Sequence, residues 1–126
     1  IQKECMDIIQ NVDEDLESRI TACDDFEMLI ESMDNANDLE SLKLWTPLLN
    51  LLSDKEAEIR MYAAWILGTS IQNNEKAKDS FLKNNGLSIM LNCLSSEMDS
   101  ATRLKILYCL SGTIRNHPSI FEEFQK

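Results

Sequence analysis

Glycine and proline are scarce in this chain: three glycines and two prolines occur among its 126 residues. An all-β fold needs many tight turns, and these two residue types make a large share of them. Hydrophobic residues still make up 44% of the chain, enough to bury a core. Leu, Met, Glu, Lys, Ala and Gln dominate the long stretches between the few breakers, and all are good helix formers. The composition therefore predicts an all-α protein.

Histidine and closely paired cysteines are also lacking. His117 is the single histidine, and none of Cys5, Cys23, Cys93 and Cys109 forms a C-x-x-C pair. A zinc site needs clustered thiolate and imidazole ligands, so we expect no metal and no cofactor. Most of the cysteines lie among apolar residues at helical spacing and are interpreted as small buried hydrophobes. With no N-x-S/T sequon present, this usage favours a reducing, cytoplasmic compartment.

Basic residues are outnumbered, twelve against 22 acidic ones, for a net charge of −10. Nucleic acid and anionic membrane surfaces would repel such a chain, so neither is an expected partner. No apolar run approaches the roughly 20 residues that span a bilayer. No signal-peptide pattern is visible. The chain begins at Ile1 rather than Met, so we expect a piece of a longer protein, and we expect it to be monomeric.

An internal repeat organises the chain. Residues 58–74 match residues 101–117 at an offset of 43, which pairs Arg60 with Arg103 and Trp65 with Tyr108. A fainter copy lies 41 residues upstream and pairs Arg19 with Arg60. A period of about 40–47 residues is typical of armadillo or HEAT solenoids. The repeat therefore predicts an armadillo-like, right-handed superhelical solenoid of three-helix repeats.

Each repeat is expected to contain two short helices and a long third helix. The third helices are predicted at about residues 15–33, 55–73 and 100–116, side by side on one face. We interpret Ser53 and Glu56 as a capping box for the second of them, and Gly86 as the residue just past a helix end. The expected divisions are a partial first repeat (1–37), two repeats (38–74 and 75–117) and the start of another (118–126).

The long helix near residues 56–73 has two stripes. Leu67 and Ile71 belong to an apolar stripe that we expect to be buried. A second stripe of polar and aromatic side chains points elsewhere and would line the groove of an armadillo stack, where a partner lies. It contains Trp65, Thr69, Gln72 and Asn73. Packing of Trp65 against the next repeat is the alternative interpretation.

Three segments carry a family likeness: 26–37 (FEMLIESMDNAN), 44–52 (LWTPLLNLL) and 66–74 (ILGTSIQNN), with a related ending at 108–117. Together they resemble the armadillo-type nucleotide-exchange factors of heat shock protein 70 chaperones, the fungal cytosolic exchange factor and the animal heat shock protein 70-binding protein. The likeness covers about residues 15–126. The resemblance implies a co-chaperone that grips one lobe of the chaperone's nucleotide-binding domain, so that ADP and then the client leave. It also implies a flexible amino-terminal segment and further repeats, neither within these residues.

The candidate partner-binding surface combines this resemblance with the polar stripe. Ala36 is interpreted as an exposed position where a large side chain would collide with the partner without affecting folding. Residues 34–37 could alternatively be only a helix-ending turn. The predicted site residues are Asp34, Asn35, Ala36, Asn37, Trp65, Thr69, Gln72, Asn73, Arg115 and Asn116.

The sequence lacks the motifs of two other functional classes. Nuclear-import armadillo proteins bind basic peptides with Trp and Asn four residues apart on successive third helices. Here Thr69 stands four residues after Trp65, and Gly112 four after Tyr108, so no such ladder exists. An enzyme could use the acidic runs at 13–15 and 24–25, but these fit helix caps and solvated faces better. The sequence shows no nucleophile–base pair, metal cluster or phosphate loop, so we expect no enzyme.

Overall fold

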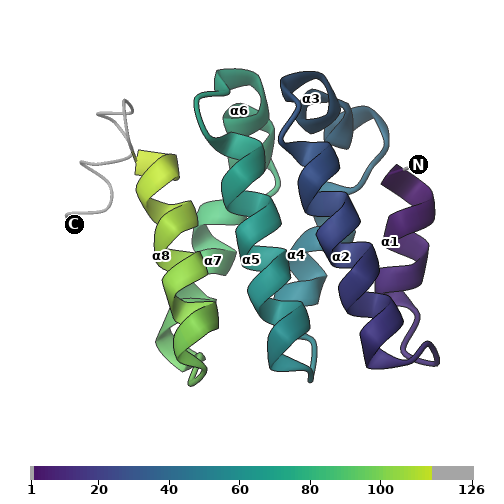
Figure 1. The fold of residues 1–126 in the computed structure, drawn as a ribbon. Helices are drawn as coiled ribbons and strands as arrows, with labels where there is room; N and C mark the ends of the chain where they lie inside the picture. Colours follow the sequence, from purple (N-terminus) through teal and green to yellow (C-terminus); the bar gives the residue numbers. More distant parts are fainter. Residues whose placement is uncertain (1, 115–126) are drawn as a thin grey trace.

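The computed structural model describes residues 2–114, and every regular element among them is helical (Figure 1). The chain begins with α1 (Gln2–Gln10) and α2 (Leu16–Ile30). It continues with α3 (Met33–Ser41), α4 (Trp45–Asn50), the short 3-10 helix η1 (Leu51–Ser53) and α5 (Ala57–Ile71). The last described helices are α6 (Glu75–Lys83), α7 (Gly86–Ser96) and α8 (Ser100–Ile114). The predicted all-α, armadillo-like fold is confirmed.

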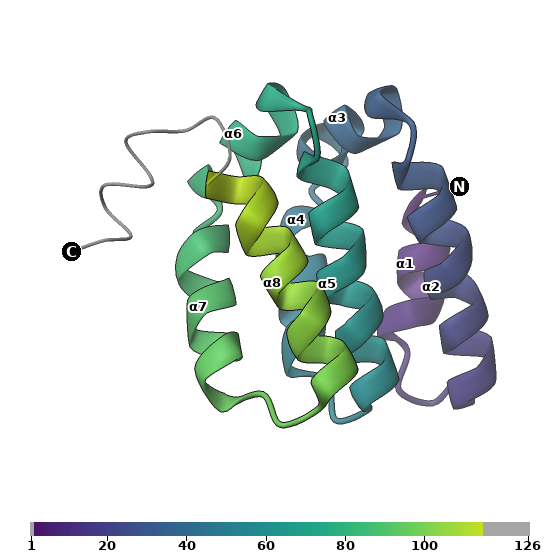
Figure 2. The same ribbon diagram turned by 60° about the vertical axis from the view of Figure 1, so that its left-hand side comes forward.

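The three long helices stand in one row. In Figure 1, α2, α5 and α8 lie side by side, with α3 and α6 crossing one end. The other side of this row is covered by α1, α4 and α7: in the turned view of Figure 2, α7 stands to the left of α8, and α4 and α1 lie behind α5 and α2. Each long helix has 15 residues, and their starts at Leu16, Ala57 and Ser100 keep the sequence offsets of 41 and 43. The predicted third helices are confirmed. The division into repeats remains a prediction, and α3 spans the expected boundary at residues 37 and 38.

The core runs continuously through the stack. Leu67 and Ile71 are both fully buried, which confirms the predicted apolar stripe. Gly68 lets α5 and α8 approach closely, because a Cβ there would lie 2.6 Å from the ring of Tyr108. Cys23 and Cys109 are buried free thiols as expected, and burial raises the pKa of each to about 12. They are packing residues rather than reactive thiolates.

The arginines at the repeated position hydrogen-bond the long helices to the turns between helices. Nη2 of Arg19 donates to Oδ1 of Asp54 at 2.6 Å, and Nε of Arg60 donates to Oε1 of Glu97 at 2.8 Å. Arg103 donates to the carbonyl oxygen of Glu97 at 3.0 Å. Asp54 and Glu97 are themselves 43 residues apart. The arginines therefore recur because each one hydrogen-bonds a long helix to a turn between two helices.

Two local predictions at helix ends are wrong. Ser53 lies in η1, and no side chain caps α5, whose N-cap residue is Glu56. Asp54 accepts the backbone N–H of Glu56 instead, at 2.9 Å, because its carboxylate is already held by Arg19. Gly86 is the first residue of α7, and Asn85 takes the left-handed conformation with φ of 65°. Glycine is needed at 86 because a Cβ there would meet the ring of Phe81.

Candidate partner-binding surface

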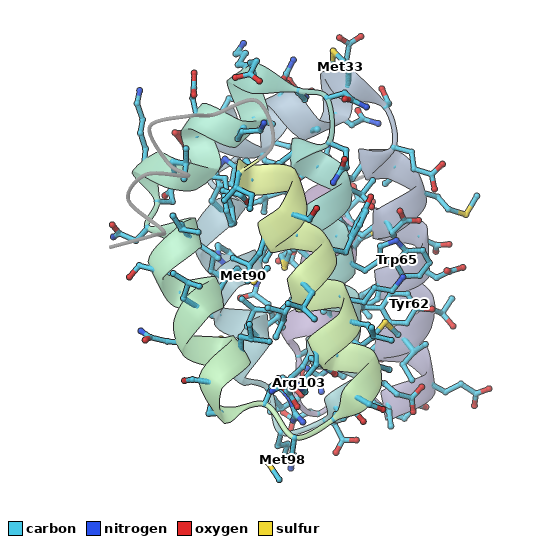
Figure 3. All side chains as sticks on the ribbon, turned by 90° about the vertical axis from the view of Figure 1, so that its left-hand side faces the viewer. Met33, Tyr62, Trp65, Met90, Met98 and Arg103 are labelled. Atoms are coloured by element: carbon cyan, nitrogen blue, oxygen red, sulfur yellow. The ribbon has the colours of Figure 1, made fainter. Side chains whose placement is uncertain are left out.

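The exposed side of α2, α5 and α8, called here the three-helix face, carries the predicted polar and aromatic stripe. Trp65 is half-buried and stacks on Tyr62, with ring centroids 5.6 Å apart. Nζ of Lys105, on α8, lies 4.2 Å from the centroid of the Trp65 ring. Figure 3 shows Tyr62 and Trp65 together between α8 and α2. Trp65 therefore contacts the next repeat, as the alternative interpretation held, and still exposes part of its ring.

A buried carboxylate lies beside this cluster on α2. Glu27 is only 4% exposed, and its Oε2 accepts a hydrogen bond from Oγ1 of Thr69 at 3.0 Å. Burial raises the pKa of Glu27, the Thr69 hydroxyl lowers it, and the neighbouring Glu31 raises it again. Thr69 is thus committed to an interhelical contact between the first two repeats and is only partly available to a partner.

Gln72 and Asn73 follow the end of α5. The Gln72 side chain lies directly against Gly112 of α8, in space that a Cβ at Gly112 would occupy. Asn73 is exposed and has a φ of 50°, a left-handed conformation that asparagine tolerates better than most residues. These two residues therefore shape the chain between α5 and α6, and Asn73 presents its side chain to solvent.

The structure contradicts the surface position expected for Ala36. Residues 34–37 form the first turns of α3 rather than a turn that ends a helix. Ala36 lies on the inward side of that helix with Leu39, and it is 2% exposed. A large side chain there would enter the core, so the expectation that folding would tolerate it is wrong.

The neighbours of Ala36 differ in what they offer a partner. Asp34 is exposed in the first helical turn. Nδ2 of Asn35 donates to the carbonyl of Leu29 at 2.8 Å, closing the corner between α2 and α3. Oδ1 of Asn37 is buried and has no hydrogen-bond partner within residues 2–114. Asp34 is the one exposed residue of this group, since Asn35 and Asn37 are half-buried.

The predicted site is therefore only partly gathered. Trp65 and Thr69 share the three-helix face, and the other described positions of the predicted site lie in the first turns of α3 or just after α5. Arg115 and Asn116 fall outside the described residues. Sequence reasoning missed Tyr62, Lys105 and Glu27. The first two could have been found, because they occupy the same repeat position 43 residues apart and lie one turn from the aromatic stripe. Nothing in the sequence marks Glu27 as buried.

No metal-binding constellation accompanies this face within the part of the chain that the structure describes. In the same region no helix is long and apolar enough to cross a bilayer. What the face offers is an aromatic pair, a cation and carboxylates on a rigid helical scaffold. These features define a helical-repeat protein whose long helices carry an exposed aromatic and charged surface.

The comparisons place this repeat protein in a family. The SIL1/FES1/HPBP1 C-terminal domain matches residues 35–126, and the nucleotide exchange factor Fes1 domain matches residues 2–39. The chain belongs to the SIL1/FES1/HPBP1 family, which confirms the resemblance seen in its motifs.

Curated relatives agree with this assignment. The chain is 44% identical over 127 residues to the Hsp70 nucleotide exchange factor FES1 of Candida glabrata, covering 99% of this chain and 44% of the relative. It is 45% identical over 129 residues to the protein of the same name from Saccharomyces cerevisiae, covering 100% and 44%. The Mycosarcoma maydis protein of that name is 45% identical over 111 residues, covering 88% and 28%. The chain thus spans less than half the length of these relatives.

Proposed function

We propose that this chain binds the nucleotide-binding domain of an Hsp70 chaperone and promotes the release of ADP. The observation that carries the proposal is membership of the SIL1/FES1/HPBP1 family together with relatives named Hsp70 nucleotide exchange factor. In physical terms the chain and ADP are negatively coupled ligands of the chaperone, and the coupling is reciprocal. The chain itself forms and breaks no covalent bond, so it acts as a co-chaperone and not as an enzyme.

The proposed contact surface is the three-helix face, extended by Asp34 and Asn73. Aromatic side chains that are half-buried and held in place make strong interface anchors, because little conformational entropy is lost when they bind. Trp65 fits that description, since Tyr62 and Lys105 fix its ring. The net charge of −10 supports a partner surface with basic residues. We further propose that the chain acts as a monomer in the cytoplasm, where its four free cysteines stay reduced.

The test measures release of a fluorescent ADP analogue from a purified Hsp70 nucleotide-binding domain, with and without the chain. We expect faster release with the chain, and slower release with Trp65→Ala, because the mutant should bind at least about tenfold more weakly, about 1.4 kcal/mol. Lys76→Ala, an exposed change on α6, is the matched control and should behave like the wild type. Full-length Candida glabrata FES1 serves as the positive control.

Two results would contradict the proposal. Absence of binding by the chain, while the full-length relative binds under the same conditions, would place the activity outside these residues. Equal binding by Trp65→Ala and wild type, with both folded by circular dichroism, would move the contact surface away from the three-helix face.

A further inference from the structure

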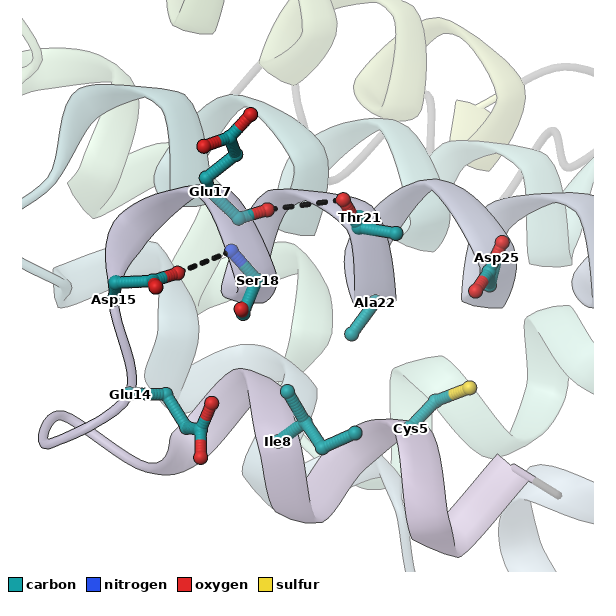
Figure 4. A pocket seen from close by; sticks show the side chains of 9 residues that line it. All are labelled: Cys5, Ile8, Glu14, Asp15, Glu17, Ser18, Thr21, Ala22 and Asp25. Carbon is teal, nitrogen blue, oxygen red and sulfur yellow. Dashed lines mark hydrogen bonds between the residues drawn. The ribbon is translucent and has the colours of Figure 1, made fainter.

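A second recessed surface lies at the opposite edge of the stack, between α1 and α2. Two adjoining cavities of about 450 and 480 Å³ share Cys5 and Asp25 in their linings, so together they form one groove along this helix pair. Figure 4 shows Cys5 and Ile8 of α1 below Ala22 and Asp25 of α2, with Ile8 and Ala22 pointing toward one another. We call this the α1–α2 groove. It lies on the side of α2 away from α5, which packs on the other side of α2, with α8 beyond α5.

The floor of the α1–α2 groove is apolar and partly open to solvent. Ile8 is 41% exposed and Met28 is 64% exposed, and the half-buried Cys5 and Leu29 lie between them. Burial raises the pKa of the Cys5 thiol, with a smaller contribution from Asp25, so this thiol stays neutral at pH 7 and behaves as an apolar wall. Large apolar side chains left open in a groove mark a surface that another chain can cover.

The rim carries charge of one sign. Glu14, Asp15, Glu17 and Asp25 line the groove, and among the described residues no lysine or arginine lines either cavity. Asp15 accepts the backbone N–H of Ser18 at 2.7 Å as the cap of α2. Carboxylates around an apolar floor attract a ligand that combines apolar and cationic side chains, and they repel an acidic one.

The dimensions fit a helix. On α2 the groove lining runs from Glu17 to Leu29, about 18 Å at about 1.5 Å per residue, so a partner helix of about 14 residues would span it. An amphipathic helix places apolar side chains every three or four residues against the floor and directs its remaining side chains toward the rim. We propose that the α1–α2 groove binds an amphipathic helix with a basic polar face, contributed by another protein.

The experiment uses the full 126-residue chain and a labelled helical peptide of about 14 residues, with leucines on one face and lysines elsewhere, followed by fluorescence anisotropy. One control peptide has glutamates in place of the lysines, and another has the same composition with the leucines scattered around the helix. We expect binding of the first peptide only. Asp25→Lys and Ile8→Lys should each weaken it at least about tenfold, about 1.4 kcal/mol.

Asp79→Lys is the matched charge control, because Asp79 is an exposed carboxylate on α6, far from the groove. It makes the same change in net charge and should alter the affinity less than about twofold. If Ile8→Lys lowers the melting temperature, Met28→Lys replaces it, since Met28 is the more exposed of the two. Hydrogen exchange should slow in residues 5–8 and 22–28 when the peptide binds.

Three results would overturn the inference. If Asp25→Lys and Asp79→Lys weaken peptide binding equally, the effect comes from the net charge of the chain and not from the groove. Equal binding of the scattered peptide would show that no groove is recognised. A concentration-dependent dimer that Asp25→Lys dissolves would assign the groove to a second copy of this chain. Chaperone binding by Asp25→Lys should stay normal, so failure here and failure of the proposed function are distinguishable.

Discussion

At the scale of single residues, a larger side chain should destabilise the fold where a small residue is buried in the core, even if its sequence neighbours are polar. Ala36 is such a residue, buried on the inner side of α3 with exposed Asp34 one half-turn away. Ala36→Arg should therefore destabilise the fold by about 3 kcal/mol or more, because it leaves an uncompensated charge in the core. Urea unfolding followed by circular dichroism measures this. Asp34→Arg, the matched control, should cost less than about 1 kcal/mol through the helix dipole. Equal stability of the two variants would mean that α3 is rotated from the position described.

At the scale of helices, alanine substitutions at two glycines are expected to have opposite effects on stability. Gly86 begins α7 against the rigid, buried ring of Phe81, which also packs on Trp45 with centroids 6.0 Å apart. Gly86→Ala should cost about 1–3 kcal/mol by overpacking. Gly112 lies inside α8, where an added Cβ would crowd the end of the Gln72 side chain, which can move, and would lie 3.7 Å from Cδ1 of Ile71, an ordinary contact distance. Gly112→Ala should thus be neutral or stabilise by up to about 1 kcal/mol through helix propensity. Thermal melts of both variants test this. A loss of stability in Gly112→Ala alone would show that the tighter packing is at Gly112 rather than at Gly86.

The helices also show what the sequence could and could not predict. The offsets of 41 and 43 residues placed α2, α5 and α8 correctly, because a repeat must present the same apolar stripe to each neighbour. The prediction of a helix cap at Ser53 was wrong because Asp54, which is hydrogen-bonded to Arg19, accepts the backbone N–H of Glu56 instead. The prediction that Ala36 is exposed was wrong. Its asparagine neighbours suggest a surface segment, but the helical period places Ala36 on the buried side of α3 with Leu39. Contacts between distant residues, such as Thr69 with Glu27, have no local signal at all.

At the scale of the whole molecule, buried carboxylates predict a stability maximum at mildly acidic pH. Hydrogen bonds from Arg60 lower the pKa of Glu97 below its ordinary value of 4.5, despite burial. Burial also opposes the charge of Asp54, but Arg19 and the Glu56 N–H outweigh it and lower the pKa of that carboxyl below 3.8. Such groups stabilise the fold above their unfolded pKa, and this stabilisation is lost as pH falls through the folded pKa. Acidification below about pH 4.5 should therefore destabilise the stack.

Glu27 acts in the opposite direction. Its pKa is raised, first by burial and then by Glu31, so the charged form disfavours folding at neutral pH. As pH falls through that raised pKa, Glu27 becomes neutral and stability rises, until the ordinary value of 4.5 is reached. The melting temperature should therefore increase from pH 7.5 to about pH 5 and decrease below about pH 4. Partial neutralisation of the net charge of −10 adds to the same rise.

Two variants separate these contributions in melts recorded from about pH 3.5 to 7.5. Glu27→Gln keeps an acceptor for the Thr69 hydroxyl but cannot titrate, so its melting temperature should rise less than that of the wild type between pH 7.5 and 5. Glu97→Gln loses the charge that Arg60 holds, so it should be less stable at pH 7 and should lose less on acidification below pH 4.5. A wild-type melting temperature that climbs steadily toward neutral pH would contradict the role of Glu27. A Glu97→Gln profile parallel to the wild type would show instead that the Arg60 contact adds nothing to the folded state.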